Sequence, residues 1–184
     1  MPNEEVDCQD DCTVGTEIRL GPYTSIRKFA EDWQRILTKI NTRYNNAVPC
    51  TKGSASNESI GQHHHLGVLY LDPGITFSDW KDMRQKIGRN IRKMLPFFEA
   101  LYTNDPQSDY KSYRMACRTN YCSPIRDGVA ISFNNRYAEI NGRDDHGTVE
   151  VRVYDSHLPQ VALTVARMEM AIIKATCEKN IMPQ

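Results

Sequence analysis

The chain has 184 residues and a formal net charge of zero, because 23 Lys and Arg residues balance 23 Asp and Glu residues. This length favours one domain with a substantial core, and the balanced charge does not indicate a nucleic-acid binder. No apolar run is long enough to span a bilayer, and the first residues, MPNEEVDCQDDC, are acidic where a signal peptide would be basic and then apolar. We therefore expect a cytoplasmic protein that binds neither nucleic acid nor membranes.

The N-terminal segment differs in composition from the rest of the chain. Residues 1–14 are predicted to form an acidic, flexible tail, followed by a single domain at residues 15–184. Cys8 and Cys12 lie in this tail. Without a secretion signal we expect free thiols, and the spacing of these two cysteines is not that of a zinc-ribbon pair. A metal held by Cys8 and Cys12 remains the alternative to a mobile tail.

Apolar patterning predicts both strands and helices. Strands are predicted at 15–20, 62–71, 129–133, 136–141 and 148–154, the third and fourth as a hairpin with Asn134-Asn135 at its turn. Helices are predicted over 24–45, over 77–102 with a kink or an end near Pro96, over 109–120, and after a Ser156 cap with Pro159 in the first turn. These elements predict an α+β fold, a mostly antiparallel sheet of about five strands with three to four helices packed on one face.

Three of the predicted strands carry polar pairs at positions i and i+2, which point to the same side of a strand. The pairs are Glu17 and Arg19, His63 and His65, and Glu150 and Arg152. His64 is expected on the apolar side, packed or hydrogen-bonded. If the strands are neighbours, two carboxylates, two imidazoles and two guanidinium groups converge on one face of the sheet.

These residue types have a chemistry in common. Carboxylates and imidazoles are suitable ligands for Mg²⁺ or Mn²⁺, and arginine binds phosphate or carboxylate groups. Phosphoryl transfer depends mainly on positioning and charge neutralisation, so a sheet face could support it although the chain has no GxxxxGK[ST] motif. The alternatives are solvated cross-strand ion pairs for the two Glu-x-Arg segments and a surface patch for the histidines.

Short motifs follow one another over about residues 15–178. They are Glu17 with Pro22, then Gly61-Gln62-His63-His64-His65, Arg118 with Tyr121-Cys122, Arg136-Tyr137 with Asn141, and Glu150-x-Arg152. This order resembles that of the amidoligases related to glutamine synthetase and glutamate–cysteine ligase, and in particular a small member of the kind that phages encode. If a phage encodes this protein, we expect it to be located in the cytoplasm of the host cell.

The resemblance implies an activity and a set of residues. The activity is ATP- and Mg²⁺- (or Mn²⁺-) dependent joining of a small-molecule or peptide carboxylate to an amine, through an acyl phosphate. By position, the resemblance implies metal ligands at Glu17, His63, His65 and Glu150, catalytic roles for Glu150 and Arg152, and nucleotide or substrate contacts at Arg19, Arg136 and Asn141.

The sequence departs from the family in one respect. The family usually begins with an earlier strand that carries a Gly-x-Glu-x-Glu signature, and we expect no such strand before Glu17. A protein partner or self-association could complete the site, the enzyme could be a reduced one, or the scaffold could be an inactive binding or assembly protein, such as a phage structural or host-interacting protein. A metal-dependent hydrolase with the same ligands is a further alternative.

Overall fold

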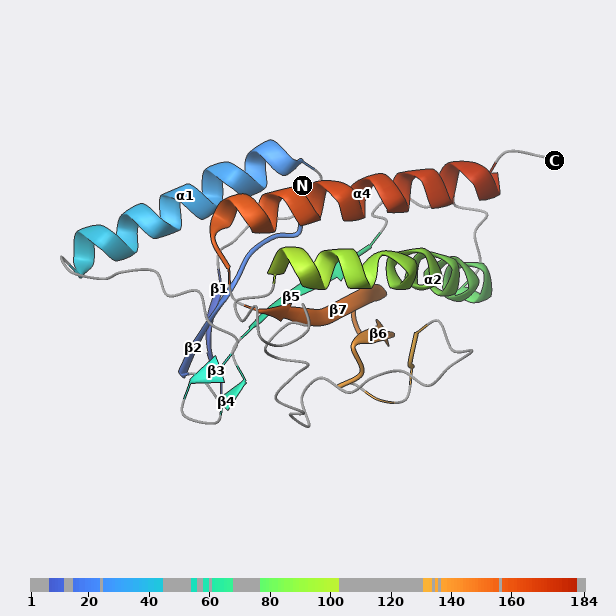
Figure 1. The fold of residues 1–184 in the computed structure, drawn as a ribbon, viewed down its shortest axis with the longest axis horizontal. Coiled ribbons are helices and arrows are strands. Elements are labelled where there is room, and N and C mark those ends of the chain that lie inside the picture. The colour runs from blue at the N-terminus through green and yellow to red at the C-terminus, as the bar shows by residue number, and fades with distance from the viewer. Residues whose placement is uncertain are drawn as a thin grey trace.

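The computed structural model describes residues 7–11, 15–23, 25–44, 54–55, 58–59, 61–67, 77–102, 131–133, 135, 137–155 and 157–181. Over these residues the fold is α+β, as predicted, with three helices and with strands that pair in an antiparallel manner (Figure 1). The predicted helix at 109–120 and the residue Arg136 lie outside the described residues. Within the described part of the chain, no helix has the length and apolar character needed to cross a bilayer.

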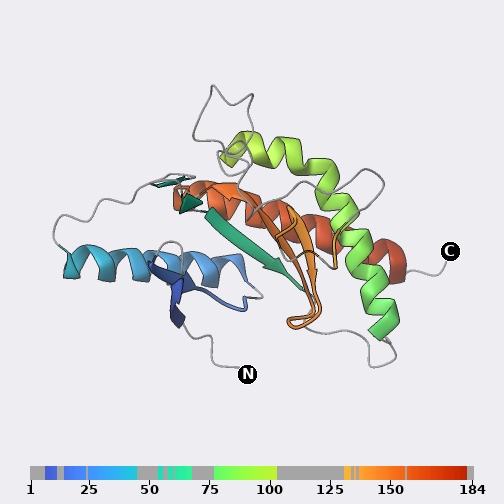
Figure 2. The ribbon, with the colours of Figure 1, turned by 90° about the horizontal axis from the view of Figure 1, so that it is seen from below.

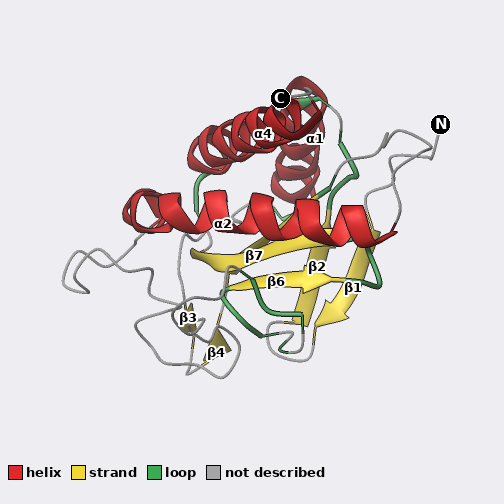
Figure 3. Ribbon diagram, turned by 90° about the vertical axis from the view of Figure 1, so that its right-hand side faces the viewer, coloured by secondary structure: helices red, strands yellow, loops and turns green. Residues whose placement is uncertain are grey.

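The central sheet has three strands in the order β5 (Gly61–Leu66), β7 (Thr148–Asp155) and β6 (Ile140–Arg143), each antiparallel to its neighbour. Figure 3 shows the helices α2 (Phe77–Tyr102) and α4 (Pro159–Ile181) on the same side of this sheet. The core lies between these layers. Helices on one face leave the other face of the sheet available for polar side chains.

The sequence pattern explains this packing. In β7, the side chains of Val149, Val151 and Val153 are fully buried, and valine favours strands because its branched side chain packs well on a pleated surface. In α2 the residues Ile87, Ile91, Leu95 and Phe98 recur at helical spacing and form the apolar stripe that meets the sheet. Helix α4 begins at Pro159, the position predicted for proline in the first turn.

Two helices agree with their predicted limits to within two residues. Helix α1 (Ile26–Arg43) starts after Ser25, whose hydroxyl accepts a hydrogen bond from the Lys28 backbone N–H at 3.4 Å. Helix α2 does not end at Pro96, since it continues to Tyr102. Its axis bends toward its C-terminal end (Figure 2), as expected where a proline removes a backbone hydrogen bond.

Part of the predicted N-terminal tail is a strand. Asp7–Asp11 form β1, which pairs in an antiparallel manner with β2 (Gly15–Arg19). A strand therefore precedes Glu17 where the sequence predicted a flexible tail, and it carries the sequence DCQDD and not a Gly-x-Glu-x-Glu signature. These two strands form a sheet of their own, and a third sheet pairs β3 (Ser54–Ala55) with β4 (Glu58–Ser59).

The predicted hairpin between 129–133 and 136–141 is wrong where the structure describes it, and residues 129, 130, 134 and 136 lie outside the described residues. Ser132 instead forms an isolated parallel bridge with Asn141, and the antiparallel hairpin joins β6 to β7. Gly142 and Arg143 lie beyond the predicted strand 136–141 but extend β6, and only 144–147 form the turn. Gly147 has a φ of +62°, a left-handed conformation that glycine adopts without strain. The turn of the observed hairpin therefore lies at 144–147, between β6 and β7, whereas the hairpin turn was predicted at Asn134-Asn135.

Candidate functional site

A buried carboxylate lies at the centre of the sheet face opposite the helices. Glu150 is 1% exposed. Its Oε1 lies 2.5 Å from Arg152 Nη1, 3.3 Å from His63 Nδ1 and 3.7 Å from His65 Nε2. Its Oε2 lies 3.3 Å from Arg143 Nη1 and 3.4 Å from Asn141 Nδ2. We call these residues the Glu150 cluster: His63, His65, Asn141, Arg143, Glu150 and Arg152.

Strand register brings the cluster together. Glu150 in the central strand β7 is paired with His65 of β5 on one side and with Asn141 of β6 on the other. Directly opposed residues in neighbouring strands share a face of the sheet, so these three side chains form a row across it. A register irregularity between Gln62 and His64 adjusts the pairing beside His63, whose ring lies 3.4 Å from Arg152 Nη1.

Arg152 and His65 have different electrostatic environments. The Arg152 guanidinium is almost buried, lies against the Tyr137 ring at 5.7 Å from its centroid, and contacts Glu150. His65 is partly buried, with a side chain that is 38% exposed, and its Nδ1 lies 3.1 Å from the Thr148 hydroxyl. Burial lowers the pKa of His65, and the nearby Glu150 charge, which acts in the opposite direction, does not reverse this. His65 is therefore mainly a neutral imidazole at pH 7, able to accept a proton.

The turn that joins β6 to β7 is fixed to helix α2. Arg84 is fully buried and donates hydrogen bonds to the Arg143 carbonyl at 3.2 Å and to Asp144 Oδ1 at 2.6 Å. Trp80 Nε1 donates to the Gly147 carbonyl at 3.0 Å. Both ends of the turn are therefore held, which positions Arg143 and Glu150 on the two strands that leave it.

His64 points away from the cluster, as predicted. Its Nδ1 lies 2.6 Å from Glu169 Oε2, and the Tyr154 hydroxyl donates to the other oxygen of Glu169 at 2.7 Å. Glu169 and Tyr154 are fully buried. This network attaches β5 and β7 to α4, so it holds the strand on which His63 and His65 lie.

The predicted site residues fall into three groups. His63, His65, Asn141, Glu150 and Arg152 lie together. Glu17 and Arg19 form the second group and lie in β2, where they pair with Gln9 and Asp7 of β1 in a separate sheet. The side chain of Glu17 is outside what the structure describes. Arg136 forms the third group, because the whole residue lies outside the described part of the chain. Sequence reasoning missed Arg143, and the one signal for it was its position two residues after Asn141.

A metal site is not evident in the described part of the chain. No group of three or more His, Cys, Asp or Glu side chains there is placed to hold a metal ion. Glu150, the central carboxylate, accepts hydrogen bonds from two arginines. The metal-binding role of Glu17, His63, His65 and Glu150 therefore stays a prediction.

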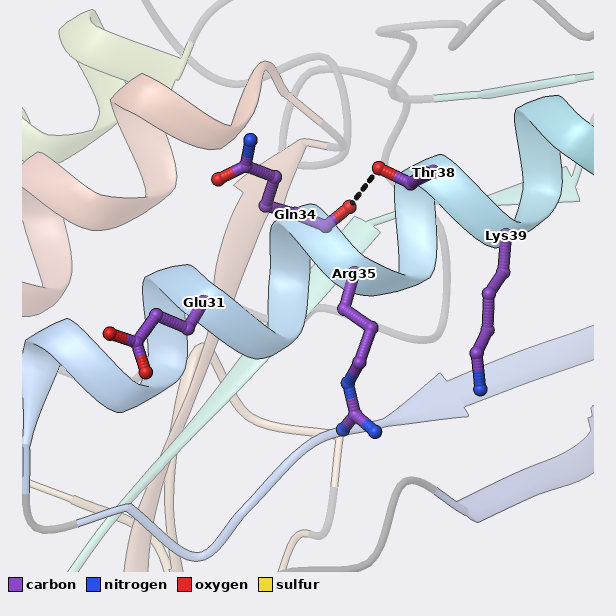
Figure 4. A pocket seen from close by; sticks show the side chains of 5 residues that line it. All are labelled: Glu31, Gln34, Arg35, Thr38 and Lys39. Carbon is purple, nitrogen blue, oxygen red and sulfur yellow. Dashed lines mark hydrogen bonds between the residues drawn. The ribbon is translucent and has the colours of Figure 1, made fainter.

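A hollow lies on the exposed side of α1 (Figure 4). It is lined by Glu31, Gln34, Arg35, Thr38 and Lys39. The one hydrogen bond drawn among these residues runs from the Thr38 hydroxyl to the Gln34 carbonyl within the same helix, at 2.9 Å. All five residues come from a single helix, so the hollow brings no separate elements together, and we do not assign it a function.

No family model matches the chain, and neither a curated protein nor a solved structure matches it. The class of site is therefore defined by its own geometry: a buried carboxylate on a sheet face, surrounded by two arginines, two histidines and an asparagine.

Proposed function

We propose that the chain is an ATP- and Mg²⁺-dependent carboxylate–amine ligase of the amidoligase type. The observation that carries the proposal is the convergence of His63, His65, Asn141, Glu150 and Arg152 on one sheet face. The resemblance implies a role for each of these five residues, and they come from three different strands. Their shared location supports a common site.

The chemistry proceeds in two steps that the cluster suits. A substrate carboxylate oxygen attacks the γ-phosphorus of ATP, the bond to ADP breaks, and an acyl phosphate forms. An amine nitrogen then attacks the acyl carbon, the bond to phosphate breaks, and an amide and inorganic phosphate result. We assign to Arg152 the neutralisation of the transferred phosphoryl group, since charge stabilisation is the main requirement of such a step.

The second step releases a proton from the attacking amine. His65 is the candidate base, because burial lowers its pKa and leaves the ring neutral at pH 7. Asn141 and Arg143 lie on the other side of Glu150 and are candidates for substrate contacts. Mg²⁺ enters as part of the Mg·ATP substrate, and one or two protein carboxylates can suffice to bind it.

We further propose a larger, glutamine synthetase-like sheet of about five strands, in which β2 would extend the central sheet beside β5 and bring Glu17 and Arg19 toward the cluster. In support, β5 pairs with β7 on one side, and no described strand pairs with it on the other. A crystal structure in which β2 lies away from the β5 edge would contradict this part of the proposal.

The ligase is tested by product formation. Purified protein is incubated with Mg·ATP, a panel of amino-acid and dicarboxylate substrates, and hydroxylamine as the amine, and ADP and hydroxamate are measured. An ¹⁸O-labelled carboxylate should transfer its label to the released phosphate. The Glu150→Gln variant should lose product formation, and the exposed control Glu178→Gln should retain it. Absence of both ADP formation and Mg·ATP binding in calorimetry would show that the proposal is wrong.

One observation favours the inactive binding or assembly protein as the second candidate. Arg152 Nη1 lies 2.5 Å from Glu150 Oε1, so the carboxylate is already occupied by a positive group. A protein of this kind would bind an anionic ligand at the arginines without ATP turnover. Anion binding without ADP formation in the same assays would favour this candidate.

A further inference from the structure

Arg143, the last residue of β6, contacts the carboxylates of two residues, Glu150 and Asp145. Its Nη1 faces inward, 3.3 Å from the buried Glu150. Its Nε and Nη2 donate to the two oxygens of Asp145 at 2.9 and 2.5 Å. Arg143 is 21% exposed and Asp145 is 55% exposed, so the second carboxylate meets the guanidinium on the solvent side.

Asp145 lies at the tip of a turn whose ends are fixed. Asp144 and Gly147 are held by α2 through Arg84 and Trp80. The His146 ring meets the His65 ring edge-on at 5.6 Å between centroids, and its Nε2 lies 3.6 Å from Asp145. The tip of the turn therefore lies against the cluster, and the Asp145 side chain is exposed on a backbone that is anchored at both ends.

Arg143 contacts Asp145 with the same two-donor geometry by which arginine binds the carboxylate of a separate ligand. Two parallel N–H donors match the two oxygens of a carboxylate. Arg143 and Arg152 carry two positive charges here, and Glu150 and Asp145 carry two negative charges. If Asp145 leaves, one positive charge remains uncompensated beside the cluster, and an incoming carboxylate would restore the balance.

We propose that Arg143 binds a carboxylate group of the ligand of this protein, and that Asp145 occupies this position in the free chain as an internal competitor. The identity of the carboxylate as a ligase substrate rests on the proposed function, but its binding to Arg143 does not. The hydrogen bonds between the two side chains also raise the pKa of Arg143 and lower that of Asp145, so both stay charged across the range in which ligands are tested.

The test measures anion binding without ATP or Mg²⁺. Succinate and inorganic phosphate are titrated into the full chain, with binding followed by calorimetry or by NMR shifts. The Asp145→Asn variant should bind succinate roughly fivefold more tightly, because an exposed Arg–carboxylate pair is worth up to about that factor. Arg143→Lys should weaken succinate binding, because it keeps the charge but loses the paired donors. The double variant Arg143→Lys with Asp145→Asn should show no gain.

Glu31→Gln is the matched control. Glu31 is 54% exposed and pairs with Arg27 at 2.9 Å on α1, so this substitution removes the same charge and also releases an arginine, away from the cluster. It should leave succinate affinity unchanged. An equal gain in Glu31→Gln, no gain in Asp145→Asn, or a gain that survives in the double variant would overturn the proposal. Tighter binding of phosphate than of succinate in Asp145→Asn would overturn the carboxylate assignment.

The outcomes separate this inference from the ligase. A gain in succinate affinity through Arg143 with no ADP formation would support the internal competitor and contradict the ligase. ADP formation together with unchanged succinate affinity in Asp145→Asn would support the ligase and contradict the internal competitor.

Discussion

Replacement of Glu150 by Gln should destabilise the fold by about 3 kcal/mol. The Glu150 side chain is 2% exposed and that of Arg152 is 9% exposed, so their interaction is largely shielded from water. Gln has nearly the shape of Glu, and the substitution therefore removes charge without opening a cavity. Arg143 keeps Asp145 as a partner, but Arg152 loses the carboxylate that it contacts most closely.

The magnitude follows from the asymmetry of buried ion pairs. Loss of one partner from a buried pair costs about 3–5 kcal/mol, and the lower end applies because the Gln carbonyl can still accept one hydrogen bond from Arg152. For a chain of this size, about 3 kcal/mol corresponds to a decrease in Tm of roughly 6–12 °C. This is a large fraction of the total stability of a typical domain.

Urea unfolding followed by circular dichroism measures the effect directly. The midpoint should fall while the m value stays constant, which would show that stability has changed and compactness has not. Glu178→Gln is the control, since Glu178 is 63% exposed and lies 3.8 Å from Lys174, and it should change stability by less than about 0.5 kcal/mol. If Glu150→Gln were as stable as this control, the view of Glu150 as the charged centre of the cluster would be refuted.

Three other substitutions test separate parts of the structure. Gly142→Ala should destabilise by about 1–3 kcal/mol in thermal unfolding, because its Cβ would lie 2.3 Å from the Phe133 ring; an unchanged Tm would contradict this contact. Tyr154→Phe should lose about 1–3 kcal/mol in urea unfolding, because the buried Glu169 loses a hydrogen-bond donor; wild-type stability would argue against the bond. Burial lowers the folded-state pKa of His65, so its contribution to stability is present above the unfolded pKa of about 6.5 and is lost as the pH falls through the lower folded value. His65→Gln should flatten the decline in unfolding free energy below about pH 6.5, and an unchanged slope would contradict the shift.

Local patterns were enough to predict much of the central sheet and its polar face. Alternation in β7 placed Glu150 and Arg152 on the side opposite Val149 and Val151, and it placed His64 apart from its neighbours in β5. This works because the period of two is a property of the strand itself. Five of the predicted site residues lie together because strand register then aligned them.

The rest depended on pairing between distant segments. The sequence of β1, DCQDD, has no apolar face, so its strand conformation follows from pairing with β2 and not from its own composition. Arg143 lies beyond the predicted strand 136–141, among glycine and charged residues, whereas pairing with β7 extends β6 through it. Propensity is a weak guide to strands for this reason, since tertiary context decides.

A double variant would separate stability from function in the Glu150 cluster. Buried ion pairs often add no net stability compared with uncharged residues of similar volume, although the loss of one partner is costly. Glu150→Gln together with Arg152→Met should therefore recover part of the stability lost in Glu150→Gln alone, by about 1–2 kcal/mol in urea unfolding. Under our proposal it should not recover ADP formation, because Arg152 is the group expected to neutralise the phosphoryl group. If the double variant retained product formation, the cluster would be a structural feature, and the catalytic site would have to be sought elsewhere in the chain.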